Sequence, residues 1–385
     1  MSGWRRVELR QVADEVTVGH VGSMASLYQL TGIPFLRSQN VTPHAIDLTD
    51  VKYIGEDFHQ RLAKSELRPG DVVTVRTGKP GITAVMPDKL PVANCSDLVI
   101  TRTGPDLDAH WLSYYMNSAA EGYISAQLVG AVQQHFNVGA AKKLVLHLPP
   151  LAEQRAIAEV LGALDDKIAA NTKMVETAET LSRAVFRSIV GDALSTPLSA
   201  TARFVNGKAF TKGASGTGRV VIRIAELNSG LGGSTVFSDA EVGDDFLARP
   251  GDILFAWSGS LTLHRWFRSE GIVNQHIFKV VPNGYPSWLV YELLRDRLTY
   301  FKGIAADKAT TMGHIQRGHL DELVYLPSRS SIDRVDELMT SLWDRTLLAE
   351  RENETLAATR DSLLPQLMSG TLRVGDAEAH IKELF

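Results

Sequence analysis

The sequence predicts a mixed α/β (α+β) fold in which two similar domains are separated by two long helices that form an antiparallel coiled coil. The tetrapeptide Arg-Pro-Gly-Asp occurs twice, at 68–71 and 249–252, and each copy precedes a short apolar run. A glycine follows at the same offset in both copies, Gly78 and Gly259. Each copy then runs through a Leu-Pro pair into a long stretch with little Gly or Pro. This internal repeat indicates pseudo-twofold symmetry, which would suit a target that itself comes in two halves.

The repeat divides the chain into four segments. We expect a first domain over 1–147 and a first long helix, with its entry, over 148–191. A second domain is expected over 192–327, and the second helix with a C-terminal tail over 328–385.

Both long helices carry an apolar seam with a 3.5-residue period, which is typical of a coiled coil. The first is predicted over 151–190, after the helix-entry signal Pro149-Pro150, and the second over 332 to about 367. Asn171 interrupts the first seam, either as a solvated defect or as a register-setting amide. Pro365 should kink or stop the second helix, and Gly370 should mark a turn after it. We expect the helices to pack on each other; the alternative is that each packs on its own domain.

Each domain is predicted to be rich in strands. The clearest strands are 72–75 and 253–256, which follow a Pro-Gly-Asp turn. Further matched pairs are 98–100 with 277–281, 144–146 with 323–325, and Leu36-Arg37 with Ile222-Arg223. Short helices are expected at about 109–118 and 286–299.

Composition describes an ordinary globular chain of 385 residues with a net charge of −4. No apolar run reaches the length of a membrane helix, and the first residues lack the apolar core of a signal peptide, so we expect a cytoplasmic protein. The one cysteine, Cys95, excludes an internal disulfide and is expected to be a small buried residue. Residues 1–150 carry 14 basic and 14 acidic side chains, so any attraction for phosphate is modest or shared with a partner.

No catalytic set is evident. The glycine-rich stretch 213–218 has no strand, helix and Lys-Ser/Thr in the places a phosphate loop needs, so a flexible loop is expected. Asp165 and Asp166, with Lys167, form an Asp-x-Lys that nuclease sites also use, but their place on the long helix favours a solvated helix face. The histidines show no ligand spacing, so no metal site is predicted.

The polar positions that recur between the two copies are Arg, Lys, Gln, Asn, Ser and His on loops after strands. Segment 76–79 matches 257–260, segment 94–96 matches 274–276, and segment 133–137 matches 311–316. Such side chains read base edges and grip phosphates, although ordinary turn chemistry explains any single one of them. Because the surroundings repeat while these side chains differ, we expect two readers of two different half-sequences.

The stretch Leu148-Pro149-Pro150-Leu151-Ala152-Glu153-Gln154-Arg155-Ala156-Ile157 resembles the entry to the central helix of type I restriction–modification specificity subunits, the HsdS family. The run 164–168 continues that pattern. Leu363-Leu364-Pro365-Gln366-Leu367-Met368-Ser369-Gly370 resembles the C-terminal motif of the same family, and the two Gly-Asp turns resemble its target-recognition domains. The resemblance covers about residues 5–374.

The resemblance implies a DNA-reading subunit without catalysis and without a cofactor of its own. Two target-recognition domains would bind a two-part target in double-stranded DNA, and the helices would dock methyltransferase subunits, two by our expectation. S-adenosylmethionine would be bound by those subunits. ATP and magnesium would belong to a restriction subunit, where the system has one.

Residue-level expectations follow from the repeat and the resemblance together. Contacts with the first half-site are expected from Arg37, Arg76, Thr77, Lys79, Gln133, Gln134 and His135. Contacts with the second are expected from Arg223, Ser258, Ser260, His264, Arg265, Gln275, His276 and His314. Helix packing or partner contact is expected from Glu153, Gln154, Ile157, Leu161, Leu164, Ile168, Asn171, Met339, Leu342 and Leu356.

Three alternatives remain open. An enzyme that cuts or methylates DNA alone would need a catalytic set, and purified protein that modified DNA without partners would revive this reading. A coiled-coil scaffold with two ligand-binding domains unrelated to DNA would show no sequence-selective binding. A specificity subunit of a different phage-defence methylation system would be separated from the standard case by the neighbouring genes.

Overall fold

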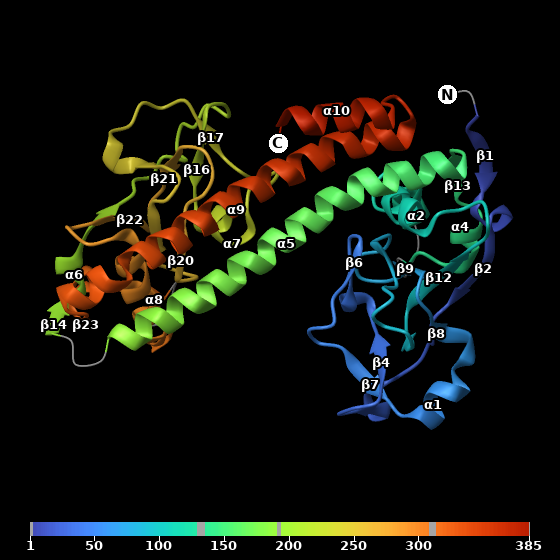
Figure 1. Ribbon diagram of the computed structural model, residues 1–385, viewed down its shortest axis with the longest axis horizontal. Helices are drawn as coiled ribbons and strands as arrows, with labels where there is room; N and C mark the ends of the chain where they lie inside the picture. The colour runs from blue at the N-terminus through green and yellow to red at the C-terminus, as the bar shows by residue number, and fades with distance from the viewer. Residues whose placement is uncertain (1–2, 129–134, 191–193, 308–312, 385) are drawn as a thin grey trace. The chain divides into compact units, whose positions relative to one another are not determined.

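The structure, a computed structural model of the 385-residue chain, describes residues 3–128, 135–190, 194–307 and 313–384 (Figure 1). The chain forms two compact units. Unit 1 contains Met1–Asp166 and Ala357–Phe385, and unit 2 contains Lys167–Leu356. The boundaries cut across two long helices, α5 (Leu151–Ile189) and α9 (Arg329–Ser369). Each unit therefore combines one globular domain with the adjoining parts of both helices.

Three sheets build the domain of unit 1. Strands β1 (Arg5–Glu8) and β13 (Val145–Leu148) form a two-stranded sheet. The four-stranded sheet has the order β10 (Thr83–Val85), β9 (Val72–Val75), β12 (Leu98–Thr103), β2 (Ala13–Val18). The five-stranded sheet has the order β3 (Tyr28–Gln29), β7 (Lys52–Ile54), β4 (Ile33–Leu36), β11 (Ala93–Cys95), β8 (Glu66–Leu67). The remaining elements are the hairpin β5 (Val41–Thr42) and β6 (Ala45–Ile46), and helices α1 (Glu56–Arg61), α2 (Ala109–Met116), α3 (Glu121–Leu128) and α4 (Val138–Lys142).

Unit 2 repeats this plan among its described residues, with four strands in place of the five-stranded sheet and no counterpart of the β5–β6 hairpin. Strands β14 (Leu194–Pro197) and β23 (Leu323–Leu326) pair as β1 and β13 do. One four-stranded sheet has the order β20 (Thr262–Arg265), β19 (Ile253–Ala256), β22 (Ile277–Pro282), β15 (Ala202–Asn206). The other has the order β17 (Phe237–Ser238), β16 (Arg219–Ile222), β21 (Gly271–Val273), β18 (Leu247–Ala248). The helices are α6 (Leu198–Thr201), α7 (Ile224–Ser229) and α8 (Ser287–Asp307). The internal repeat expected from the sequence is therefore a repeat of topology.

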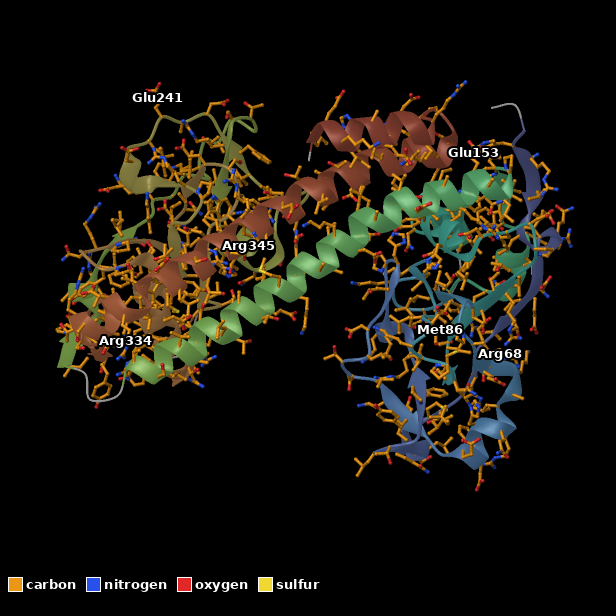
Figure 2. The ribbon with its side chains drawn as sticks, in the orientation of Figure 1. Arg68, Met86, Glu153, Glu241, Arg334 and Arg345 are labelled. Atoms are coloured by element: carbon orange, nitrogen blue, oxygen red, sulfur yellow. The ribbon has the colours of Figure 1, made fainter. Side chains whose placement is uncertain are left out.

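The Arg-Pro-Gly-Asp motif forms the same turn in both units. Gly70 and Gly251 have φ angles of 85° and 95°, which a type II turn with proline at its second position requires. The Asp71 carboxylate accepts the Arg68 backbone N–H at 3.0 Å, and Asp252 accepts that of Arg249 at 2.8 Å. Figure 2 labels Arg68, which opens the turn in unit 1. The motif thus directs the chain into strands β9 and β19.

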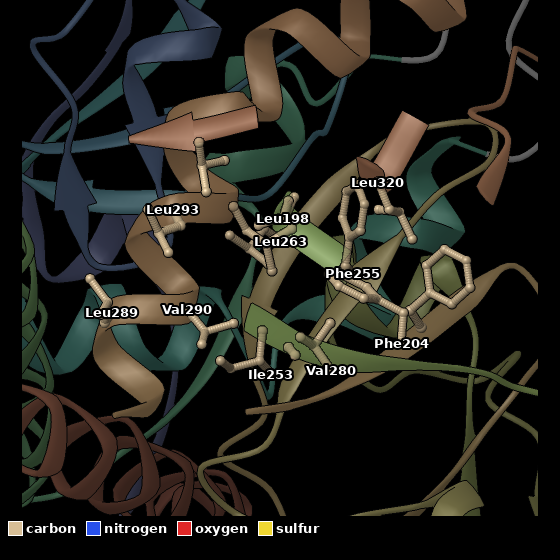
Figure 3. Packing of buried hydrophobic residues seen from close by; sticks show 14 of the residues in the cluster. Leu198, Phe204, Ile253, Phe255, Leu263, Val280, Leu289, Val290, Leu293 and Leu320 are labelled. Carbon is tan, nitrogen blue, oxygen red and sulfur yellow. The ribbon is translucent and has the colours of Figure 1, made fainter. Parts of the chain in front are cut away.

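The largest buried cluster of unit 2 joins its domain to the long helices (Figure 3). Leu289, Val290 and Leu293 of α8 belong to one cluster with Ile253 and Phe255 of β19, and Val290 points toward Ile253. The same cluster takes in seam residues of both long helices, namely Phe186, Ile189, Ile332 and Met339. Pairing of the helices with each other and packing on the domain, which the sequence posed as alternatives, therefore both occur.

The polar seam positions of the long helices meet one another. In unit 2, Asn171 is 7% exposed and donates to Glu352 Oε2 at 2.8 Å, and Lys167 pairs with Glu352 at 3.3 Å. The Asn353 side-chain amide donates to the backbone oxygen of Ile168 at 3.4 Å. Asn171 is thus a buried hydrogen-bonded residue between α5 and α9, and this pairing favours one register over its slipped alternatives.

A second polar contact closes the seam in unit 1. Arg360 of α9 donates to Asp165 of α5 at 2.6 Å, and the Tyr114 hydroxyl donates to the same carboxylate at 2.6 Å. The ring of His44 stacks on Tyr114 with centroids 4.1 Å apart. The expectation of a solvated face was wrong for Asp165, which links α2, α5 and α9, whereas Asp166 is exposed.

This arrangement predicts that unit 1 loses stability in mild acid. Burial lowers the pKa of His44 from 6.5 to about 4, while Asp165 and Arg360 act in opposite directions. The native state therefore holds His44 neutral, so its contribution is intact above pH 6.5 and is lost as the pH falls from 6.5 toward 4. At pH 5 the loss should be ~2 kcal/mol of unfolding free energy.

Urea unfolding at pH 7.5 and pH 5 measures the effect, with His44→Asn as the matched control. Asparagine tolerates the left-handed φ of 64° at this turn position and does not titrate in this range. Equal pH dependence in the two proteins would contradict the assignment to His44.

Several predicted elements differ in extent from the observed ones. Pro365 does not stop α9, which continues to Ser369 because Leu363, Leu367 and Met368 are buried and hold the last turn. Gly370 follows with a φ of 70°, as a helix-ending turn requires. The helix predicted at 286–299 extends to Asp307, and strands β4 and β16 end before Arg37 and Arg223, which cap short helices instead. The tail forms α10 (Val374–Leu384), which the sequence did not predict.

Candidate nucleic-acid interface

Loops from five places in the chain meet beside the end of strand β9 in unit 1. We call this group the first loop site and define it as residues 19–20, 36–37, 76–79, 96–97 and 135–137. Main-chain hydrogen bonds connect all five segments. In donor-to-acceptor order they are Gly19 to Leu98 (2.8 Å), His20 to Cys95 (2.8 Å), Ser96 to Leu36 (3.0 Å), Asp97 to His20 (3.2 Å), Arg76 to Asp97 (3.3 Å) and Phe136 to Arg76 (3.0 Å).

The same frame recurs beside the end of β19 in unit 2. This second loop site comprises residues 207–208, 222–223, 257–260, 274–276 and 314–316. Its main-chain bonds run from Gly207 to Ile277 (3.0 Å), Gln275 to Lys208 (2.9 Å), Asn274 to Ile222 (3.1 Å), Trp257 to His276 (3.1 Å) and Ile315 to Trp257 (3.0 Å). By this correspondence Arg76 is equivalent to Trp257, Asp97 to His276 and His135 to His314.

A glycine is required at the same place in both frames. A Cβ on Gly19 would lie 2.9 Å from the backbone oxygen of Cys95, and one on Gly207 would lie 2.1 Å from that of Asn274. Contacts this short to backbone atoms cannot be relieved by a side-chain movement. Each glycine therefore lets two chain segments approach closely enough for the frame to form.

Charged and hydroxyl side chains fill the first loop site. Arg76 Nη1 donates to Asp97 Oδ1 at 3.0 Å, and the Thr77 hydroxyl donates to Asp97 Oδ2 at 2.7 Å. Lys79 is exposed. Arg37 donates to Asp50 at 3.1 Å; hydrogen bonds from Lys52 and then from Arg37 lower the pKa of that carboxyl. The two arginines of the site are thus ion-paired with carboxylates of the same domain.

Aromatic side chains fill the second loop site instead. The Trp257 ring lies 5.1 Å from that of His276 and 6.4 Å from that of His314, and Trp257 Nε1 donates to Asn206 at 2.8 Å. Ser260 and Gln275 are exposed, whereas Ser258 is buried. Arg223 binds Glu226 through two side-chain hydrogen bonds; burial opposes ionisation of Glu226, but these bonds outweigh it and lower its pKa.

Asp97 and His276 share an uncommon backbone conformation. Their φ angles are 59° and 72°, and His44 is the other non-glycine residue with positive φ in the part of the chain that the structure describes. Left-handed residues other than glycine are uncommon, and they collect at functional sites because folding alone seldom selects them.

Most of the residues expected to contact DNA lie in the two loop sites, but two do not. Arg265 of β20 is 5% exposed; it bonds to Glu350 of α9 at 2.9 Å and lies over the Trp343 ring. Its placement at a DNA surface was wrong, because α9 covers it. His264 of the same strand pairs with Thr262 at 2.7 Å, and burial lowers its pKa. Gln133 and Gln134 lie outside the described residues.

The sequence alignment of the two copies was also wrong at one loop. Asn94 lies inside β11, opposite Phe35, whereas Asn274 follows β21. The loop after β21 is one residue longer than the loop after β11, which shifted the match and hid Asp97. His20 and Lys208 were missed as well, because nothing near them repeats in sequence except one glycine. The signal that could have found Asp97 is its position directly before an apolar strand, which His276 shares.

The helix residues expected to pack or to meet partners lie in the long helices, most of them facing inward. Ile157, Leu161, Leu164, Met339 and Leu356 are buried, and Ile168 and Leu342 are half-buried. Gln154 is fully buried and donates to Pro149 and Asp106 backbone oxygens at 2.8 and 2.9 Å, so it fixes the start of α5 within unit 1. Glu153, labelled in Figure 2, accepts the Trp4 indole N–H at 3.2 Å.

Other predictions about chemistry concern single features. Cys95 is buried, as expected, and burial raises the pKa of its thiol. Residues 213–218 form a loop. Among the residues that the structure describes, no cluster of three or more His, Cys, Asp or Glu side chains could hold a metal ion. Within the same ranges no helix is long and apolar enough to cross a membrane.

Comparison with known proteins agrees with the fold and the sequence motifs. Residues 1–180 match the family model of the type I restriction modification DNA specificity domain. The specificity subunit assigned to the type I restriction enzyme MjaX of Methanocaldococcus jannaschii is 24% identical over 194 residues. That match covers 47% of this chain and 45% of the relative, so less than half of the relative's length is matched.

One solved structure extends the likeness of fold over almost the whole chain. The S subunit of a type I restriction-modification system from M. genitalium has a TM-score of 0.64 at 13% identity, over 95% of this chain and 96% of that one. It has the same fold. The HsdS subunit from Thermoanaerobacter tengcongensis, at 16% identity and covering 97% and 98% of the two chains, has a TM-score of 0.37. Residues 1–180 therefore match the specificity domain of the type I restriction–modification class, and almost the whole chain has the fold of an S subunit of that class. The motifs at the two ends of the long helices resemble those of the same family, HsdS.

Proposed function

We propose that this chain is the DNA sequence-specificity subunit of a type I restriction–modification complex and that each loop site reads one half of a two-part target. The observation that carries the proposal is one main-chain frame, present twice, that holds different side chains in its two copies. A frame that repeats while its side chains diverge is what two readers of different half-sequences need. Phosphate and base contacts would come from the arginines, lysines, hydroxyls and histidines of the loops.

The residues proposed to contact DNA follow from this placement. In the first half-site they are Arg37, Arg76, Thr77, Lys79 and His135, together with Gln133 and Gln134 beside them in sequence. In the second they are Arg223, Ser258, Ser260, Gln275, His276 and His314. Arg37, Arg76 and Arg223 are ion-paired in the free protein, so binding DNA must exchange one partner for another.

The proposed partners are methyltransferase subunits docked on the long helices, and a restriction subunit where the system cuts DNA. Because Gln154, Leu161 and Leu164 face inward, docking is proposed for exposed residues on the same turns, such as Arg155 and Glu159. Catalysis, S-adenosylmethionine and any ATP or magnesium would belong to those partners. The chain itself would contribute recognition and spacing.

Genomic methylation tests this function. The chain is co-expressed with the methyltransferase encoded beside it, and methyladenine is mapped by single-molecule sequencing. A two-part motif with a fixed gap that depends on this chain is expected. Methylation by the chain alone would favour an enzyme, and absence of any sequence-selective methylation or binding in the complex would favour a scaffold.

Arg76→Ala is expected to relax recognition at one half-site only. A well-placed arginine contact to a base contributes ~1–3 kcal/mol of discrimination, so tolerance of other bases at one position should rise by roughly tenfold or more. Arg68→Ala is the matched control. It lies at the other end of β9, is exposed and pairs with Glu66, so it should leave the motif unchanged. If Arg76→Ala leaves both half-sites unchanged, Arg76 does not read DNA.

A further inference from the structure

Asp97 has both carboxylate oxygens committed to its neighbours in the first loop site. One oxygen accepts from Arg76 Nη1 at 3.0 Å and the other from the Thr77 hydroxyl at 2.7 Å. The backbone is constrained as well, because the Asp97 oxygen accepts the Arg76 N–H while its own N–H donates to His20. The carboxylate therefore holds the Arg76 guanidinium by one edge.

The other edge of the Arg76 guanidinium is available for a ligand. Nε and Nη2 have no hydrogen-bond partner among the residues that the structure describes, and the side chain is 18% exposed. Two parallel N–H donors match the O6 and N7 acceptors that guanine presents in the major groove. An arginine held on one side by a carboxylate loses less side-chain entropy when the other side binds.

The equivalent position in the second loop site has no such donor pair. Trp257 replaces Arg76 and His276 replaces Asp97, and their ring centroids lie 5.1 Å apart with the rings tilted by 54°. An aromatic surface of this kind lacks the paired N–H donors of a guanidinium; it suits apolar contact with a base, such as the thymine methyl group.

We propose that Asp97 is a positioning residue that presents Arg76 to a guanine of the first half-site, and that His276 occupies the equivalent specificity-determining position for the second. This inference rests on the proposed function and specifies its chemistry. The left-handed backbone at both positions supports it, since a glycine would adopt φ angles of 59° and 72° more readily. The turn alone would favour glycine at these positions, so the side chains of Asp97 and His276 are better explained by a role in binding.

Replacing Asp97 by glycine separates recognition from folding. The Asp97→Gly variant removes the carboxylate but suits the backbone, so its melting temperature should stay within about 3 °C of the wild type or rise. Methylation mapping of the co-expressed complex should show loss of preference for one guanine in one half-site, by roughly tenfold or more. His276→Gly should preserve the fold equally well and change the other half-site only.

Asp97→Asn is the conservative variant, because asparagine tolerates the left-handed region and keeps an acceptor for Arg76. Its discrimination is expected to fall between those of the wild type and Asp97→Gly. Arg76→Lys should keep part of the guanine preference that Arg76→Ala loses, since an ammonium can reach O6 and N7 but lacks the planar fork that Asp97 orients.

The outcomes distinguish the inference from the function on which it rests. If the wild-type complex shows no two-part motif, the proposed function fails. A two-part motif in which Asp97→Gly changes no guanine preference would overturn only the inference. A fall in melting temperature of more than about 5 °C for Asp97→Gly would also overturn it, because Asp97 would then be a structural residue.

Discussion

Leu164→Asp is expected to unfold unit 1. Leu164 lies on the inward face of α5, is 4% exposed, and is one turn from Leu161, which is fully buried. The substitution removes a buried leucine and places a second carboxylate beside Asp165, which already balances Arg360. Loss of the buried side chain alone costs ~2–5 kcal/mol, and an unpaired buried charge adds to that. Together these losses are comparable to the whole unfolding free energy of an ordinary domain, which is ~5–15 kcal/mol.

The neighbouring position supplies the control. Ala163 is exposed on the same turn, so Ala163→Asp adds the same charge without entering the core. Urea unfolding followed by circular dichroism should show a lost or strongly shifted transition for Leu164→Asp and a nearly unchanged one for Ala163→Asp. Co-purification of the methyltransferase should fail for the first variant only. A Leu164→Asp protein with an unchanged unfolding midpoint would show that this part of α5 is not packed as described.

Gly207→Ala is expected to break the second loop site and leave the first intact. The added Cβ would lie 2.1 Å from the backbone oxygen of Asn274 and 2.4 Å from that of Val273. The segment that follows β15 and the end of β21 would have to separate. The hydrogen bond from Gln275 to Lys208 would then be lost. Overpacking against backbone of this kind costs ~3 kcal/mol.

Methylation mapping and thermal unfolding measure the two consequences of Gly207→Ala. We expect a lower melting temperature and a motif whose second half is degenerate while the first is preserved. Gly232→Ala is the matched control, because a Cβ there meets nothing within 4 Å. Relaxation of both halves together, or of neither, would contradict the assignment of one loop site to one half-site.

The sequence carried enough information for the fold because the fold depends on periodicity and on turn chemistry. The apolar seams located α5 to within one residue, and the Pro-Gly-Asp turns located β9 and β19. Pro365 was misjudged because burial of Leu363 and Leu367 offsets one missing hydrogen bond. Helix α10 was missed because it buries little beyond Ala377 and so carries a weak apolar signal.

The site was less predictable, because partners distant in sequence decide what each side chain does. In the sequence, Arg76 and Arg265 are both arginines close to a repeated strand. Asp97 orients Arg76, whereas Glu350 and Trp343 of α9 cover Arg265. No local pattern distinguishes them. Asp97 was not predicted because the loop after β21 has one residue more than the loop after β11. The two copies were therefore aligned without a gap and out of register at this loop.

The loop frames consist only of bonds between peptide groups, and this has a consequence for how the molecule can change. Peptide groups are the same whatever residue carries them, so these bonds tolerate different side chains at 76 and 135 or at 257 and 314. At 97 and 276 they require only a residue that adopts a left-handed backbone. A new preference can therefore arise by substitution at these positions without a new shape having to be found. The backbone geometry of each loop site and its base preference can therefore change independently. The sequence recognised in one half of the target can change while that of the other half stays the same.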